Sequence, residues 1–118
     1  MVDVRNAIES LYIGNCTVTE HQKTFDETTK QTKFVDVDIL TNIPCRLSFS
    51  SVRPTDENVA ASVTQSIKLF LAPEINIPAG CKITVTQNGK TTAYKQSGEP
   101  AVHTHHQEIS LELFKKWA

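Results

Sequence analysis

Glycine is scarce in this chain, with four residues in 118, and none of them lies in a G-x-G or G-x-x-x-x-G-K arrangement. Phosphate-cradling loops need such clusters, so the sequence does not indicate a nucleotide-binding loop. No serine lies in a G-x-S-x-G nucleophile elbow, and no cysteine lies in a recognisable catalytic context. We therefore expect a protein that is not an enzyme and that uses no cofactor.

A basic excess is also missing. Lys and Arg total 12 against 13 Asp and Glu, and the estimated pI is about 6.4. Proteins that hold DNA through its phosphates usually carry a basic patch, so sequence-specific nucleic-acid binding is not expected. No apolar run approaches the ~18 residues that span a bilayer, and the N-terminus lacks the features of a signal peptide. We expect the protein to be made and to stay inside a cell, without membrane contact.

Cysteine is sparse, odd in number and unclustered. The three residues are Cys16, Cys45 and Cys81, and no C-x-x-C motif is present. Such a set argues against a disulfide framework or a structural zinc site. Reduced, partly buried thiols are the expected state.

The hairpin signal at Asn88-Gly89 is the strongest local pattern in the sequence. It separates two runs of strand-forming residues, and a type I′ turn needs the positive φ that these two residues tolerate. A two-residue loop places Ile83 opposite Tyr94 and Val85 opposite Thr92. A one-residue slip would turn Ile83 and Val85 out to water, so the register should be well specified.

Short alternating strands recur along the rest of the chain. The alternation predicts a poorly patterned edge strand at residues 16–25 and clearer strands at residues 34–40, 45–50, 66–71 and 103–113. Between them lie an apolar-free hairpin tip at residues 26–33, a break at residues 42–44 and an irregular stretch at residues 51–62. The predicted fold is a single domain over residues 1–118. It is mainly β, a small closed barrel of about six to seven antiparallel strands with a short N-terminal helix at residues 3–12.

Phe70 is the exception to the alternation, because it falls on the polar face of its strand beside Lys68. Either it lies under the N-terminal helix or it contacts another subunit. The first interpretation is favoured, since a short helix needs an apolar patch on which to dock.

Two groups of side chains suggest chemistry. His103 and His105 would project from one face of a strand as two metal ligands, with Cys81 or His21 as a third, while His106 and Glu108 would project from the other face. Two ligands on one side fall short of the three or four that zinc needs. Half-exposed histidines at a strand start are therefore the simpler interpretation. The carboxylates of Asp36 and Asp38 share a wet strand face, which is usual for solubility; paired glycosidase acids instead flank a cleft.

A family resemblance extends this interpretation. Residues 68–85 read KLFLAPEINIPAGCKITV, with the pattern Pro-x-Ile-x-Ile-x-x-Gly, and they are followed by SGEPAV at 97–102 and HQEI at 106–109. With PCRLS at 44–48 upstream, this order resembles the small minor capsid proteins of tailed phages and prophages, of the head-closure or head–tail connector type. The resemblance covers roughly residues 33–118.

The resemblance implies a structural virion protein, assembled in the bacterial host cytoplasm. Copies would form a ring below the portal that closes the DNA-filled head and offers the tail an attachment surface. The implied partners are portal or adaptor proteins and tail proteins. The chain would lie near packaged DNA without sequence-specific binding, and a monomeric free protein is compatible with this role.

The resemblance also locates the expected contacts. A loop at residues 51–64 would face the channel and its partners through Arg53, Asp56, Glu57 and Asn58, or it is merely a floppy loop. Its acids would repel DNA phosphates. An interface is expected at Phe70, Lys115, Lys116 and Trp117. The alternative function is a small ligand- or metal-binding β-barrel that uses His103 and His105.

Overall fold

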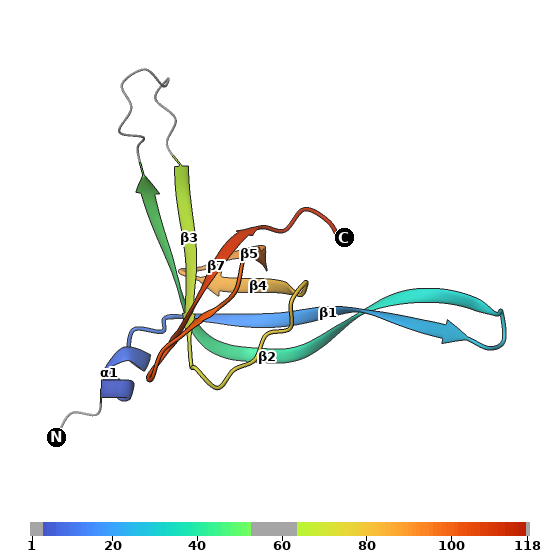
Figure 1. The fold of residues 1–118 in the computed structure, drawn as a ribbon, viewed down its shortest axis with the longest axis horizontal. Helices are drawn as coiled ribbons and strands as arrows, with labels where there is room; N and C mark the ends of the chain where they lie inside the picture. Colours follow the sequence, from blue (N-terminus) through green and yellow to red (C-terminus); the bar gives the residue numbers. More distant parts are fainter. Residues whose placement is uncertain (1–3, 53–63, 118) are drawn as a thin grey trace, which may run out of the picture.

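The computed structural model describes residues 4–52 and 64–117, which form one short helix and seven strands (Figure 1). The elements are α1 (Val4–Glu9), β1 (Gly14–Asp26), β2 (Gln31–Val52), β3 (Thr64–Leu71), β4 (Lys82–Gln87), β5 (Lys90–Gln96), β6 (Ala101–Val102) and β7 (Gln107–Leu113). The predicted channel loop, with Arg53, Asp56, Glu57 and Asn58, lies outside the described residues. The helix has six residues, too few to cross a membrane.

The strands form one antiparallel sheet that closes on itself. Their order is β3-β2-β1-β4-β5-β7-β6, and an additional β3–β7 pairing joins the two ends. Six strands therefore make a ring of hydrogen-bonded pairs, and β6 adds to β7 outside it. The predicted mainly β class with a short helix is confirmed. Closure satisfies strand edges that would otherwise invite pairing with other chains.

The hairpin between β4 and β5 has the predicted geometry. Asn88 and Gly89 both have positive φ, at 54° and 77°. Ile83 pairs with Tyr94 and Val85 pairs with Thr92. Both cross-strand pairs place apolar atoms in the interior, so the predicted register is confirmed.

The core fills the inside of the ring. Its buried apolar side chains come from every ring strand and from the segment before β4: Cys16, Val18, Cys45, Leu47, Leu69, Leu71, Ile77, Cys81, Ile83, Val85, Tyr94, Ile109 and Leu111. The three cysteines are buried thiols, as predicted. A hydrogen bond between Cys16 and Cys45 raises the pKa of the Cys45 thiol and lowers that of Cys16.

β2 is one continuous strand where the sequence indicated two. The expected break at residues 42–44 is an irregularity in which Asn42 adopts a φ of 55°. The β1–β2 register shifts there: Cys16 faces Ile43, but Val18 faces Leu40. Extra residues in one strand bend and twist it without ending it. This shift also buries the adjacent residues Val18 and Thr19, which explains the poor alternation of β1.

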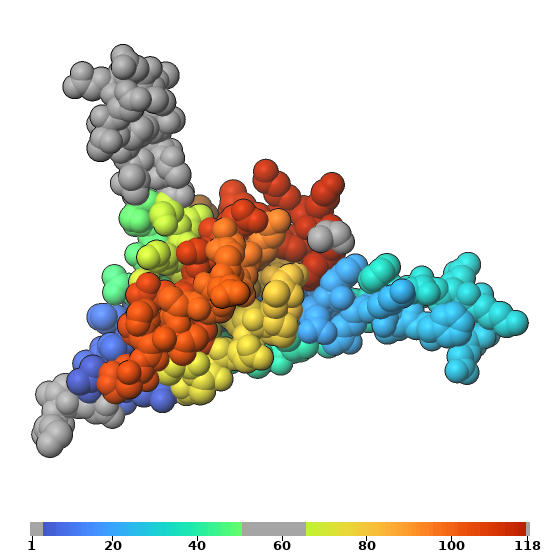
Figure 2. Space-filling model, viewed as in Figure 1, coloured from blue at the N-terminus to red at the C-terminus, as the bar shows by residue number. Residues whose placement is uncertain are grey.

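The edge-strand prediction for residues 16–25 is wrong in its first half. Residues 15–19 of β1 lie between β2 and β4 and pair with both. The rest of β1 pairs with β2 alone among the described strands. This outer hairpin, residues 20–26 and 31–38, projects from the ring as a two-stranded ribbon that we call the arm (Figures 1 and 2). Its turn lies within the predicted tip, at residues 27–30.

Gln87 closes the gap where β1 begins. Its amide replaces a missing strand pairing: the Leu47 N–H donates to Oε1 at 2.8 Å, and Nε2 donates to the Leu47 carbonyl at 3.1 Å. Gly14 starts β1 in the same corner, where an added Cβ would lie 3.1 Å from Gln87 Oε1. Gln107 acts similarly at the other end, because its buried Nε2 donates to the carbonyls of Ala72 and Ile75 at 2.8 and 2.5 Å.

The N-terminal helix is shorter than predicted and does not bury its apolar side chains. None of residues 4–9 is buried, and Leu11 just after the helix is also exposed. α1 is held through Arg5, which forms ion pairs with Glu9 on the helix and with Glu74 before β4. Phe70 instead lies with its ring centroid 6.0 Å from that of His106. The favoured interpretation, that the helix covers Phe70, is not what the structure has.

Candidate interaction surfaces and metal-ligating cluster

One face of the arm is aromatic. Directly paired residues of antiparallel strands project to the same face, and the register pairs His21 with Asp36, Lys23 with Phe34 and Phe25 with Thr32. His21, Phe34 and Phe25 therefore share one face. Phe25 is 63% exposed and Phe34 is 58% exposed.

The C-terminal segment packs onto this face through stacked rings. The His21 ring is parallel to those of Phe34 and Trp117, with both centroids 4.7 Å away, so it lies between them. Trp117 also meets Phe114 edge-on at 4.9 Å, and Lys82 Nζ lies 5.4 Å from the Phe114 ring centroid. Such aromatic pairs contribute about 0.5–1.5 kcal/mol beyond their buried area. This aromatic row, Phe34–His21–Trp117–Phe114, fastens the base of the arm to the ring.

Beyond the row, the arm leaves apolar side chains exposed. Val35, on the opposite face, is also exposed. Both edges of the arm are unpaired among the described residues, because β4 reaches only Thr19 on β1 and β3 reaches only Cys45 on β2. Exposed apolar side chains beside open strand edges mark surfaces that pair with other chains. Sequence reasoning missed this surface, although one signal was present: Phe34 is an apolar residue on the same strand face as Asp36 and Asp38.

The predicted interface residues lie in separate places. Trp117 is half-buried in the aromatic row, and Lys115 and Lys116 beside it are exposed. Phe70 lies on β3 against His106. The structure therefore places Trp117 against the arm and Phe70 elsewhere, on β3 beside His106.

Asp36 and Asp38 hold side chains of the facing strand. Asp36 Oδ1 lies 2.8 Å from His21 Nδ1, and the Thr19 hydroxyl donates to Asp38 Oδ1 at 2.7 Å. The two carboxylates thus orient β1 residues at the base of the arm.

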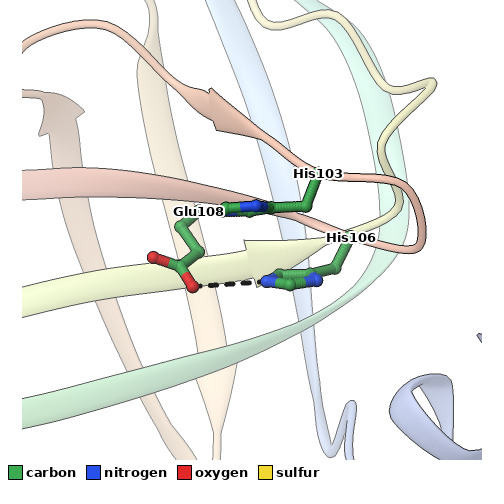
Figure 3. A group of neighbouring side chains, drawn as sticks. All are labelled: His103, His106 and Glu108. Carbon is green, nitrogen blue, oxygen red and sulfur yellow. Dashed lines mark hydrogen bonds and ion pairs between the residues drawn. The ribbon is translucent and has the colours of Figure 1, made fainter.

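The histidine cluster differs from the predicted one. β7 begins at Gln107, so residues 103–106 form the turn between β6 and β7 and are not part of a strand. The His103 N–H donates to the His106 carbonyl at 2.8 Å, and the two imidazole rings stack at 4.7 Å. The proposed partnership of His103 with His105 is replaced by one of His103, His106 and Glu108 (Figure 3). The suggested third ligands lie elsewhere, Cys81 in the core and His21 on the arm.

The cluster is compact, and its carboxylate is charged. One ligand atom from each of its three residues lies within 4.8 Å of the others. His106 Nε2 is 3.2 Å from Glu108 Oε1, and Lys68 Nζ is 3.7 Å from Oε2. The hydrogen bond from His106, followed by the charge of Lys68, lowers the pKa of Glu108 below its ordinary value. The carboxylate is therefore charged at neutral pH.

A hollow of about 510 Å³ opens at one end of the ring. Its wall includes the core residues Leu47, Val85 and Tyr94, and Lys90 is the charged residue at its rim. Among the described residues the wall is mainly apolar or neutral, and Lys90 is its charged residue.

Comparison with known proteins gives a likeness of fold. No protein-family model and no curated protein matches the chain. Among solved structures, the phage-like element PBSX protein xkdH from Bacillus subtilis is similar with a TM-score of 0.52, over 84% of this chain and 91% of that one. The sequence identity is 13%, so the comparison establishes a shared fold alone.

Proposed function

We propose that this chain is a structural protein of a tailed phage or prophage particle. In this role, copies form a connector ring below the portal that closes the filled head and provides the tail attachment surface. The observation that carries the proposal is the shared fold with a phage-element protein across most of both chains. The sequence resemblance of residues 68–85 to head-closure proteins supports it independently.

The arm supplies the contact that such a ring requires. A two-stranded hairpin alone is marginally stable in water, yet this one carries exposed phenylalanines and two open edges. In the proposed ring, the aromatic face of the arm lies on the next copy, so that Phe25 and Phe34 become buried. Identical copies that contact one another head to tail generate a ring when the rotation closes.

The near-neutral net charge of the chain is compatible with a position beside packaged DNA that the protein does not bind. The formal net charge is −1, and binding to phosphates depends on clustered Lys and Arg. We propose that the segment between β2 and β3 faces the channel and that its acidic residues, Asp56 and Glu57, repel the DNA backbone.

The direct test mixes the purified protein with its cognate portal oligomer and follows ring formation by size exclusion and electron microscopy. We expect a ring on the portal. The double variant Phe25→Ser/Phe34→Ser should lose ring closure. Val102→Ser is the matched control, because Val102 is equally exposed but lies on β6. A wild-type protein that associates with neither portal nor tail proteins contradicts the proposal.

A further inference from the structure

The turn between β6 and β7 gathers two imidazoles and a carboxylate at one end of the ring. His103 and His106 lie within the turn, and Glu108 is the second residue of β7 (Figure 3). All three side chains project to the same side of the turn (Figure 3). We propose that His103, His106 and Glu108 bind a Zn²⁺ ion. This inference is independent of the proposed role in a phage particle.

The distances are close to those of a zinc site. Zinc holds nitrogen and oxygen ligands at about 2.0–2.2 Å in a tetrahedron, which places neighbouring ligand atoms about 3.3–3.6 Å apart. His106 Nε2 and Glu108 Oε1 are already 3.2 Å apart. The farthest pair in the cluster is within 4.8 Å, so closure requires a shift of about 1.5 Å or less. His103 is exposed, and rotation of its side chain supplies this movement.

The backbone prepares the site. The hydrogen bond from the His103 N–H to the His106 carbonyl fixes the two residues across the turn. Glu108 is fixed by the pairing of β7 with β3 and β6, where it faces Phe70 and Ala101. The ion therefore meets ligands whose main chain is already placed, which lowers the ordering cost of binding.

The donor set selects the kind of ion. Imidazole nitrogen with carboxylate oxygen suits Zn²⁺ and other late first-row metals, whereas Mg²⁺ and Ca²⁺ prefer oxygen ligands alone. Lys68 engages Glu108 Oε2, and Oε1, which accepts a hydrogen bond from His106 Nε2, would exchange that hydrogen bond for the metal as Nε2 gives up its proton and binds the same ion. Three protein ligands leave the fourth position of the tetrahedron to water. Bound zinc would pin β6, a strand of two residues, against the end of β7.

The test is calorimetric titration of ZnCl₂ into the full-length protein, prepared without an affinity tag and stripped with a chelator. We expect binding of about one ion per chain and a rise in melting temperature, because an ion that binds the folded state stabilises it. MgCl₂ should give neither effect.

Variants of the turn decide which residues bind. His103→Ala and Glu108→Gln should each weaken zinc binding about tenfold or more, since each removes one of three ligands. His105→Ala is the matched control, a histidine in the same turn but outside the cluster, and it should leave affinity within about twofold. His103→Gln, which keeps a polar side chain of similar length, guards against a folding defect in the alanine variant.

Two results overturn the proposal. One is the lack of a stoichiometric zinc heat in the wild-type protein. The other is a loss in His105→Ala as large as that in His103→Ala, which would indicate a loose histidine-rich surface. Cobalt substitution adds a spectroscopic check: a thiolate charge-transfer band would show that cysteines bind the ion in place of the cluster, and this too would overturn the assignment.

Discussion

The arm is the continuation of β1 and β2 beyond the six-stranded ring, yet ring and arm treat apolar side chains in opposite ways. In the ring, Leu69 and Ile83 are fully buried at 0% exposure. On the arm, Phe25 and Phe34 are more than half exposed. The local sequence patterns of the two regions are alike. Alternation along a strand predicts that one face is apolar, but it does not predict whether other residues cover that face. The ring covers its own apolar face, whereas the arm leaves Phe25 and Phe34 exposed.

The largest expected effect separates the two regions by stability. Leu69→Ala should cost about 2–5 kcal/mol of the free energy of unfolding, because it leaves a cavity among buried side chains. Phe25→Ala should stay within about 0.5 kcal/mol, as exposed positions do. Urea denaturation of the free protein measures both. If Phe25→Ala proves as costly as Leu69→Ala, the arm packs on its own ring in solution and the comparison fails.

Two glutamines, Gln87 in the ring and Gln22 on the arm, test the same difference in stability between ring and arm. Gln87→Ala should cost about 1–3 kcal/mol, because it leaves the N–H and carbonyl of Leu47 without their partner at the seam of the ring. Gln22 on the arm bonds the neighbouring Glu20 side chain, and Gln22→Ala should change the free energy of unfolding by less than about 0.5 kcal/mol. Denaturant midpoints with unchanged slopes would support this ranking. Equal losses of unfolding free energy in Gln87→Ala and Gln22→Ala would contradict the bridging role of Gln87.

The junction between ring and arm can be examined through the lone tryptophan. His21→Ala removes the ring between Phe34 and Trp117, with an expected loss of about 0.5–1.5 kcal/mol. Trp117 is the single Trp in the chain, so its emission should shift to the red and its quenching by acrylamide should increase. His105→Ala, distant in the β6–β7 turn, should leave emission unchanged. An unaltered spectrum in His21→Ala would mean that the C-terminal segment is held by other contacts.

Much of the ring could be predicted from the sequence because its patterns are local. The Asn88-Gly89 turn and the alternation around Ile83 and Val85 fix a hairpin without reference to distant residues. The continuity of β2 could not be predicted in this way. The residues Asn42-Ile43-Pro44 are typical of the end of a strand. β2 continues through them because it stays paired with the neighbouring β1, whose register shifts opposite this point.

The candidate sites were harder to predict, since they depend on where elements end. The arm, with Phe25 and Phe34, extends beyond the residues at which β4 and β3 stop pairing, Thr19 on β1 and Cys45 on β2, and no local pattern encodes these end points. The histidines were assigned by strand periodicity, which pairs His103 with His105. A turn at residues 103–106 changes that periodicity and brings His106 to His103 instead.

The smallest expected effect is on the pH dependence of stability, and it comes from the pair of Glu108 and His106 at the end of the ring. The pair tests whether side chains in this region stabilise the chain itself or, like those of the arm, remain exposed. Glu108 has a lowered pKa in the folded state because His106 donates to it. Its contribution is therefore complete above the ordinary Glu pKa of about 4.3. It is lost as the pH falls further, because the unfolded chain then binds a proton that the folded chain resists.

Glu108→Gln should therefore flatten the decline of stability below about pH 4.3 and lower stability at neutral pH by less than about 1 kcal/mol, the usual range for an ion pair at the protein surface. Denaturation with a chelator present, at neutral and acidic pH, isolates this effect from metal binding. His106→Ala should give the same flattening, and the double variant should add nothing further, because both changes remove one interaction. Additive effects would mean that Glu108 and His106 act on stability through different partners. The end of the ring would then resemble the arm, with side chains arranged for contacts made outside the chain.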